Sequence, residues 1–148
     1  MLLRDEKQMS VNAVERLCFE TADHYEAAAS ELGADHLAQV FAALAAERQH
    51  LAAELAVHIR ALDDLPQQPD PDREAISHML SGIKALLSGD MRASLVADCE
   101  RGEEALVSAV HAALRQDLPP EMHAVLRRIL AHAESAQREL TAANRSSG

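Results

Sequence analysis

Apolar and small residues recur every three or four positions along several long stretches of this chain. Such spacing places them along one side of an α-helix, so the pattern predicts amphipathic helices. Their expected ranges are about 10–32, 36–62, 74–87, 91–115 and 120–143, and the two ends of the chain are expected to be frayed or disordered. The stretch 36–62 is the strongest, because it contains no Gly or Pro. Its predicted inward positions are Leu37, Phe41, Leu44, Arg48, Leu51, Leu55, His58 and Leu62.

The connections between these stretches predict how the helices pack. The first and second helices, and the last two, are separated by only a few residues, so each pair should form antiparallel neighbours. The middle connection is long, with three prolines within 63–72. Its helix of about 14 residues would span roughly 21 Å, enough to help return the chain to the other end of the bundle. We therefore expect a single all-α domain over 1–148, a ferritin-like antiparallel four-helix bundle with one long crossover that carries a short extra helix.

Composition supports helices and narrows the choice of partners. Hydrophobic residues make up 48% of the chain but aromatic residues only 2%, and a core of Ala and Leu favours helices. The formal net charge of −10 argues against nucleic acid or an anionic membrane as a partner. There is no apolar stretch of about 20 residues, no signal-peptide pattern and no disulfide framework, so we expect a cytoplasmic protein.

The central stretch also holds the only motif with a chemical precedent, Glu47-x-x-His50. Ferritin-like di-iron bundles use this spacing for metal ligands on a helix. Counting residues from the turns brings several polar side chains to one level near mid-height. A metal site at that level, for iron or manganese, would draw on Glu20, Glu47, His50, Glu100, Glu103 and His132.

The direction of these side chains weakens the metal hypothesis. At 100° per residue, Glu47 lies about 65° and His50 about 125° from the centre of the apolar side of their helix. The last helix has Ile129, not a Glu, three residues before His132. The di-iron ligand set is therefore incomplete, and we favour a solvated helix flank, no cofactor and no assigned catalytic residue. A partial metal site remains the alternative.

Arg48 and Glu103 are better candidates for the interior. They lie about 35° and about 30° from the centres of the apolar sides of their helices. A buried charge is costly unless it is paired, so we predict an Arg48–Glu103 ion pair. Tyr25, the only tyrosine, is also internal, and its hydroxyl is expected to bond into the same layer. The predicted buried polar layer therefore comprises Tyr25, Arg48 and Glu103.

Two further residue types bear on partners and redox chemistry. Phe19 points away from the predicted core side of the first helix, and an exposed aromatic residue indicates a partner surface. We therefore expect a homo-oligomer, a dimer formed through the first helix or the 74–87 helix. Cys18 and Cys99 both lie on core sides, where cysteine usually acts as a small apolar residue, so a redox pair is not favoured.

Three segments resemble a known family. They are Leu44-Ala-Ala-Glu47-Arg48 with the following Glu54-Leu55, the run Cys99-Glu-Arg-Gly-Glu-Glu104, and Tyr25. Together they are similar to a bacterial ferritin-like family known only as a domain of unknown function, over about residues 11–140. The resemblance implies a ferritin-like bundle, bacterial and cytosolic, without a settled activity. It maps the family's Glu-Arg and Gly-Glu residues onto Glu47, Arg48 and Glu103.

Two functional hypotheses follow. The favoured one is a ferritin-like bundle without a complete di-iron site, which serves as a non-catalytic binding or interaction module, with stress physiology as a suggested setting. The alternative is a ferritin-like oxidase or metal-storage protein that binds iron or manganese. The sequence leaves the question of enzyme activity open, and the balance of residues favours the first hypothesis.

Overall fold

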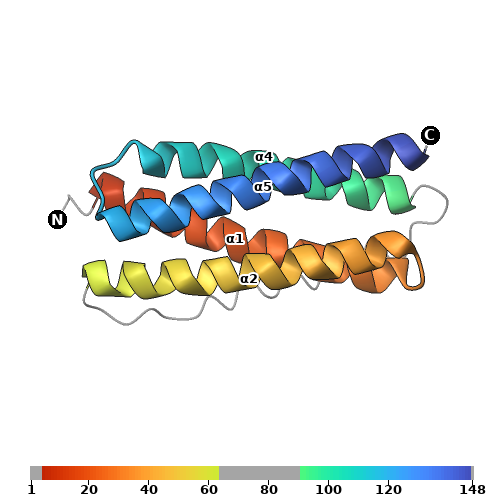
Figure 1. Ribbon diagram of the computed structural model, residues 1–148, viewed down its shortest axis with the longest axis horizontal. Helices are drawn as coiled ribbons and strands as arrows, with labels where there is room; N and C mark the ends of the chain where they lie inside the picture. Colours follow the sequence, from red (N-terminus) through yellow and green to blue (C-terminus); the bar gives the residue numbers. More distant parts are fainter. Residues whose placement is uncertain (1–4, 64–90, 148) are drawn as a thin grey trace.

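The computed structural model of this protein describes residues 5–63 and 91–147, and in these ranges every long segment is an α-helix. The helices are α1 (Asp5–Leu32), α2 (His36–Asp63), α4 (Met91–Leu114) and α5 (Pro120–Ser147), which run side by side (Figure 1). The predicted all-α class and four-helix bundle are confirmed. The predicted helix 74–87 lies outside the described residues. Within the described helices, no segment is long and apolar enough to cross a membrane.

Two predicted helix ends were wrong. The first helix begins at Asp5 instead of near residue 10, and the last helix continues to Ser147 instead of ending near residue 143. Once a helix has nucleated, each further residue adds a hydrogen bond, and neither extension contains a Gly or Pro that would stop it. The N- and C-terminal polar residues therefore extend the two helices.

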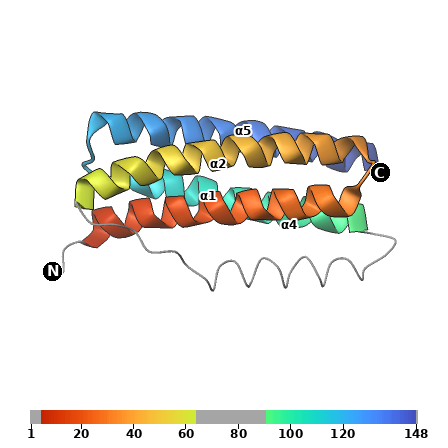
Figure 2. The ribbon, with the colours of Figure 1, turned by 90° about the horizontal axis from the view of Figure 1, so that it is seen from below.

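The four described helices form a square in which the backbones of neighbouring helices approach closely and those of diagonal helices do not. In the described ranges, α1 packs against α2 and α4, and α5 packs against α4 and α2, while the pairs α1–α5 and α2–α4 lie diagonally opposite. Figures 1 and 2 show that neighbouring helices run in opposite directions, and that α2 ends at the opposite end of the bundle from the start of α4. The end of α2 and the start of α4 are therefore placed as the predicted long crossover requires.

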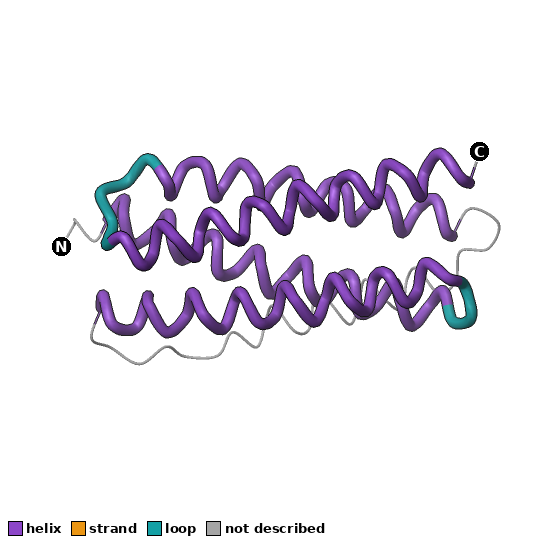
Figure 3. The backbone as a smooth tube through the Cα atoms, viewed as in Figure 1, coloured by secondary structure: helices purple, strands orange, loops and turns teal. Residues whose placement is uncertain are grey.

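The two short turns at opposite ends of the bundle are visible in Figure 3. Gly33 ends α1 with a φ of 60°, and its N–H donates to the carbonyl of Ala29 (3.2 Å). Asp35 then caps α2, because its carboxylate accepts the N–H of Leu37 (2.9 Å). In the other turn, Leu118 is buried and Pro120 begins α5.

The described apolar interior divides into two half-cores, one toward each end of the bundle. The larger half-core contains sixteen buried residues: Val11, Val14, Cys18, Leu51, Ala52, Leu55, Ile59, Leu106, Val110, Ala113, Leu118, Met122, Val125, Leu126, Ile129 and Ala133. The smaller half-core contains twelve: Tyr25, Ala28, Leu37, Phe41, Leu44, Ala45, Leu95, Val96, Cys99, Ala136, Leu140 and Ala143. On α1, α2 and α4, the positions between the two sets carry polar side chains described next, and on α5 the polar His132 directly precedes Ala133 of the larger half-core.

Three predicted side-chain directions were wrong. His58 is only half-buried and Leu62 is exposed, while Ile59 takes the inward position. A strict seven-residue repeat drifts by about 20° per heptad on a straight helix, which rotates the core side by one residue toward the end of α2. Phe19 is partly buried against the larger half-core, so it is not the exposed aromatic residue that the sequence predicted.

Candidate functional site

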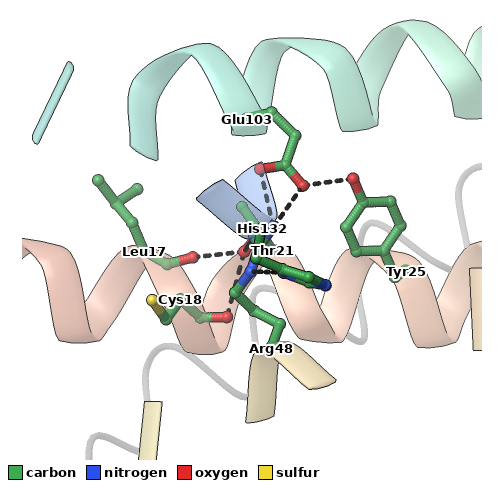
Figure 4. A network of polar contacts seen from close by, with 7 residues as sticks. All are labelled: Leu17, Cys18, Thr21, Tyr25, Arg48, Glu103 and His132. Atoms are coloured by element: carbon green, nitrogen blue, oxygen red, sulfur yellow. Dashed lines mark hydrogen bonds and ion pairs between the residues drawn. The ribbon is translucent and has the colours of Figure 1, made fainter. Parts of the chain in front are cut away.

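The centre of the bundle is occupied by the side chain of Arg48, which reaches inward from α2 and is completely buried (Figure 4). Its Nη1 donates to the Thr21 hydroxyl on α1 (2.7 Å). Its Nη2 donates to both carboxylate oxygens of Glu103 on α4 (3.0 and 2.9 Å). Its Nε donates to Nδ1 of His132 on α5 (3.1 Å). One guanidinium group therefore bonds to all three of the other helices.

The carboxylate of Glu103 is the acceptor at the other side of this layer. It is completely buried, and it accepts a hydrogen bond from the hydroxyl of Tyr25 as well as those from Arg48. Burial raises the pKa of the Glu103 carboxyl, while Arg48 and then the Tyr25 hydrogen bond favour its charged form. Burial, and next the charge of Glu103, raise the pKa of Tyr25, so its hydroxyl remains a donor.

Thr21 completes the layer on the side of α1. Its hydroxyl accepts from Arg48 and donates back to the main chain of its own helix, with the carbonyl of Leu17 at 2.8 Å and that of Cys18 at 3.1 Å. Gly102 of α4 lies opposite, where a Cβ would be only 3.1 Å from Cγ2 of Thr21. The absence of a side chain at Gly102 therefore allows α1 and α4 to approach closely at this level.

His132 is the only member of the layer that is partly exposed, among the described residues that bond to Arg48. Because its Nδ1 accepts from the Arg48 guanidinium, the ring proton resides on Nε2. Burial, and secondly the positive charge of Arg48, lower the pKa of His132 to about 4. The imidazole is therefore neutral near pH 7 and acts as a hydrogen-bond acceptor.

The structure places the three predicted members of the polar layer together. Arg48, Glu103 and Tyr25 meet at one level, with the Arg48–Glu103 ion pair at 2.9 Å and the guanidinium carbon 6.0 Å from the centre of the Tyr25 ring. Thr21 was missed as a polar partner, because it is small and lies on the same side of its helix as the inward residues Cys18 and Tyr25. Its position opposite Gly102, at the height of Arg48, is the signal that could have identified it.

The six residues of the alternative metal hypothesis are not brought together. Glu47 and His50 are exposed, and Glu20 and Glu100 are partly exposed, with Glu20 paired to Arg16 (3.3 Å). Glu103 and His132 both face Arg48 and bond to it. In residues 5–63 and 91–147, no three His, Cys, Asp or Glu side chains form a group that could hold a metal ion. Glu47 and His50 point away from the core side of α2, and this direction keeps them apart from Glu103 and His132.

The two cysteines lie on opposite sides of the polar layer. Cys18 belongs to the larger half-core and Cys99 to the smaller one; both are buried, and neither forms a disulfide. Burial is the main reason that the pKa of the Cys18 thiol rises to about 12. A protonated, enclosed thiol is unreactive as a nucleophile, and this fits the structural role expected for it.

Comparison with known proteins identifies a family but no function. A search of curated proteins and a search of solved structures each found no match. The family described as "Domain of unknown function (DUF2383)" matches residues 10–116, which include Tyr25, Arg48 and Glu103 but not His132. Because this match covers well over half of the 148 residues, the chain belongs to the family of the domain of unknown function DUF2383.

Proposed function

We propose that this protein is a non-catalytic binding or interaction module built on a ferritin-like bundle. In this bundle the Arg48–Glu103 ion pair occupies the mid-height level at which a di-iron site would lie. The observation that carries this proposal is the closure of the polar layer. All three nitrogen atoms of the Arg48 guanidinium bond to other protein side chains, and both oxygens of Glu103 accept from protein donors. A ligand or metal would have to break these bonds before it could bind.

Electrostatics support the same conclusion. A reactive centre needs polar groups that converge on a space that a substrate can enter. Here the converging groups meet a permanent cation, and a guanidinium is protonated at every physiological pH. A divalent metal at this level would be repelled by Arg48 and would have to compete with it for Glu103. The arrangement favours a structural role in which the layer sets the register of the four helices.

The binding function is therefore assigned to the outer surface. The chain carries a formal net charge of −10, and Met9 and Val57 are large apolar side chains that stay mostly exposed. Together with the resemblance to a bacterial ferritin-like family, these features support a cytosolic protein of bacterial origin that acts as a homodimer, with stress physiology as the setting. Sedimentation equilibrium tests the dimer, and a mass equal to one chain at micromolar concentration would exclude it.

Metal content is the decisive measurement between this proposal and its alternative. The full chain is purified without a chelator, its iron and manganese are measured per chain, and Fe²⁺ or Mn²⁺ is then titrated under anaerobic conditions. We expect no stoichiometric binding at micromolar metal concentrations. The alternative, an iron or manganese oxidase or storage protein, is carried by the inward placement of Glu103 and His132, and it predicts tight stoichiometric binding.

A matched pair of variants makes the metal test specific. Glu103→Gln removes the buried carboxylate, and Glu104→Gln changes its exposed neighbour in the same helix. Stoichiometric metal that is lost in Glu103→Gln and retained in Glu104→Gln would overturn the proposal. Weak binding that both variants reduce equally would reflect the acidic surface and would leave the buried layer as a structural element.

A further inference from the structure

The two half-cores differ in how much apolar material they contain. Among the described residues, the larger half-core has twelve buried side chains of Val size or above, and the smaller half-core has seven. Alanine fills four of the twelve positions of the smaller half-core. Stabilisation by burial grows with the apolar area removed from water, so among the described residues the smaller half-core contributes less of it to holding its helices together. Regions with fewer buried apolar contacts open more readily.

The end of the smaller half-core is also closed by polar contacts. Arg92, at the start of α4, bonds to the carboxylate of Asp35 in the α1–α2 turn (3.0 Å) and to the carbonyl of Ala143 near the end of α5 (3.4 Å). Both charged side chains are about a third exposed, and an ion pair in that setting contributes little. The opposite end is closed by buried Leu118 of the α4–α5 turn. One end of the bundle is therefore closed by polar contacts and the other by a buried apolar side chain.

The polar layer separates these two regions. Thr21, Arg48 and Glu103 lie on α1, α2 and α4 between the inward residues of one half-core and those of the other, and His132 of α5, next to Ala133 of the larger half-core, bonds to Arg48. Their hydrogen bonds connect α2 to each of the other helices. Opening that stops at this layer leaves its charge pair intact, whereas opening that passes through it exposes an ion pair that is completely buried.

We propose that the half of the bundle containing the smaller half-core opens as a local unit under native conditions, with the Arg48 layer as its boundary and the larger half-core remaining closed. Opening would expose the apolar side chains of Phe41, Leu44 and Leu140, which are buried in the closed bundle. The contact between Asp35 and Arg92 acts as the latch at the end that opens. This inference does not depend on the proposed function.

The two cysteines provide a built-in measurement, because one lies in each half-core. The full-length protein is treated with iodoacetamide under native conditions, and the labelling of each cysteine is followed by peptide mass spectrometry. The same rates measured in urea-unfolded protein correct for intrinsic thiol reactivity and give a protection factor for each position. Local opening predicts that the protection factor of Cys99 is at least about tenfold lower than that of Cys18.

One substitution in each half tests the latch. Asp35→Asn keeps an amide oxygen that can cap α2 but removes the charge that Arg92 contacts. It should lower the protection of Cys99 severalfold and leave Cys18 unchanged. The matched control is Glu54→Gln, which removes the carboxylate that bonds to Arg128 (Nη1–Oε1 3.0 Å) across α2 and α5 beside the larger half-core. This variant should leave the protection of Cys99 as it is in the parent protein.

The inference is overturned if Cys18 and Cys99 have equal protection factors, since both would then report global unfolding only. A lower protection factor at Cys18 would overturn it as well. The latch is overturned if Glu54→Gln lowers the protection of Cys99 as much as Asp35→Asn does, or if Asp35→Asn affects both cysteines equally. A selective effect of Asp35→Asn on Cys99 supports the local unit and its latch together.

Discussion

Arg48 of α2 and Glu103 of α4 form a completely buried ion pair (Nη2–Oε2 2.9 Å) between two described helices that lie diagonally opposite and do not pack on each other directly. The pair therefore runs through the centre of the bundle, where the bonds of Arg48 to Thr21 and His132 join the remaining two helices. Such a layer favours one register of the helices, because a shift of any helix would leave a buried charge without its partner.

The first prediction concerns the removal of Arg48. Arg48→Ala leaves the carboxylate of Glu103 buried with only the hydroxyl of Tyr25 as a partner, so the free energy of unfolding should fall by roughly 3–5 kcal/mol. Urea denaturation followed by circular dichroism measures this change. Arg101→Ala, on an exposed side chain of α4, is the control and should change it by less than about 1 kcal/mol. A similarly small loss for Arg48→Ala would contradict the role assigned to the pair.

The second prediction separates the cost of breaking the pair from the benefit of having it. Replacement of a whole buried ion network by apolar residues of similar volume is often neutral or stabilising, by about 1–4 kcal/mol. The combined variant Tyr25→Phe, Arg48→Met and Glu103→Leu should therefore be much more stable than Arg48→Ala. Urea denaturation of both variants tests this. A combined variant no more stable than Arg48→Ala would mean that the polar layer itself supplies the stability.

The third prediction concerns pH. His132 binds a proton less readily in the folded protein, with a pKa of about 4 against an ordinary value of 6.5. Its contribution to stability is therefore complete above about pH 6.5 and is lost as the pH falls from there toward 4, because the unfolded chain then binds more protons. His132→Asn retains an acceptor for Arg48 but does not titrate, so it should flatten this part of the stability curve.

The control for pH is His50, an exposed histidine of α2. His50→Asn makes the same substitution outside the polar layer, so flattening that occurs in His132→Asn and not in His50→Asn assigns the slope to His132. The carboxyls of Asp35 and Glu54 also have lowered pKa values, Asp35 chiefly through the N–H of Leu37 and Glu54 through Arg128. Those groups lose their contributions at the acidic end, below the ordinary carboxyl range. Equal flattening by both histidine variants would exclude His132 as the source.

The fourth prediction concerns the close approach of α1 and α4. Gly102→Ala gains about 1 kcal/mol of helix propensity, but the new Cβ would lie 3.1 Å from Cγ2 of Thr21. Thr21 cannot turn away without losing its bond to Arg48, so Gly102→Ala should slightly lower the free energy of unfolding of the parent protein. In a Thr21→Ser background, which lacks Cγ2 and keeps the hydroxyl, Gly102→Ala should stabilise the protein. The test compares the unfolding free energies of the parent protein, Gly102→Ala, Thr21→Ser and the double variant. An identical effect of Gly102→Ala in both backgrounds would contradict the prediction.

The sequence by itself determined the helices and the identity of the inward charges. The direction of a side chain on a helix follows from 100° per residue, so Arg48 and Glu103 could be assigned to the interior and Glu47 and His50 to the flank from their own segments. The short turns and the single long connection then predicted the bundle and its connection order. These predictions depend on local geometry and on the lengths of the connections, both of which can be obtained from neighbouring residues in the sequence.

The tertiary structure decided which atoms meet. Thr21 and His132 became partners of Arg48 because of the rotation and spacing of whole helices, which depend on the sum of many packing contacts and on the small volume of Gly102. The packing of Phe19 against the core has the same origin. Helix periodicity fixes the side on which a residue lies, but only the packed neighbours fix the atom that it contacts.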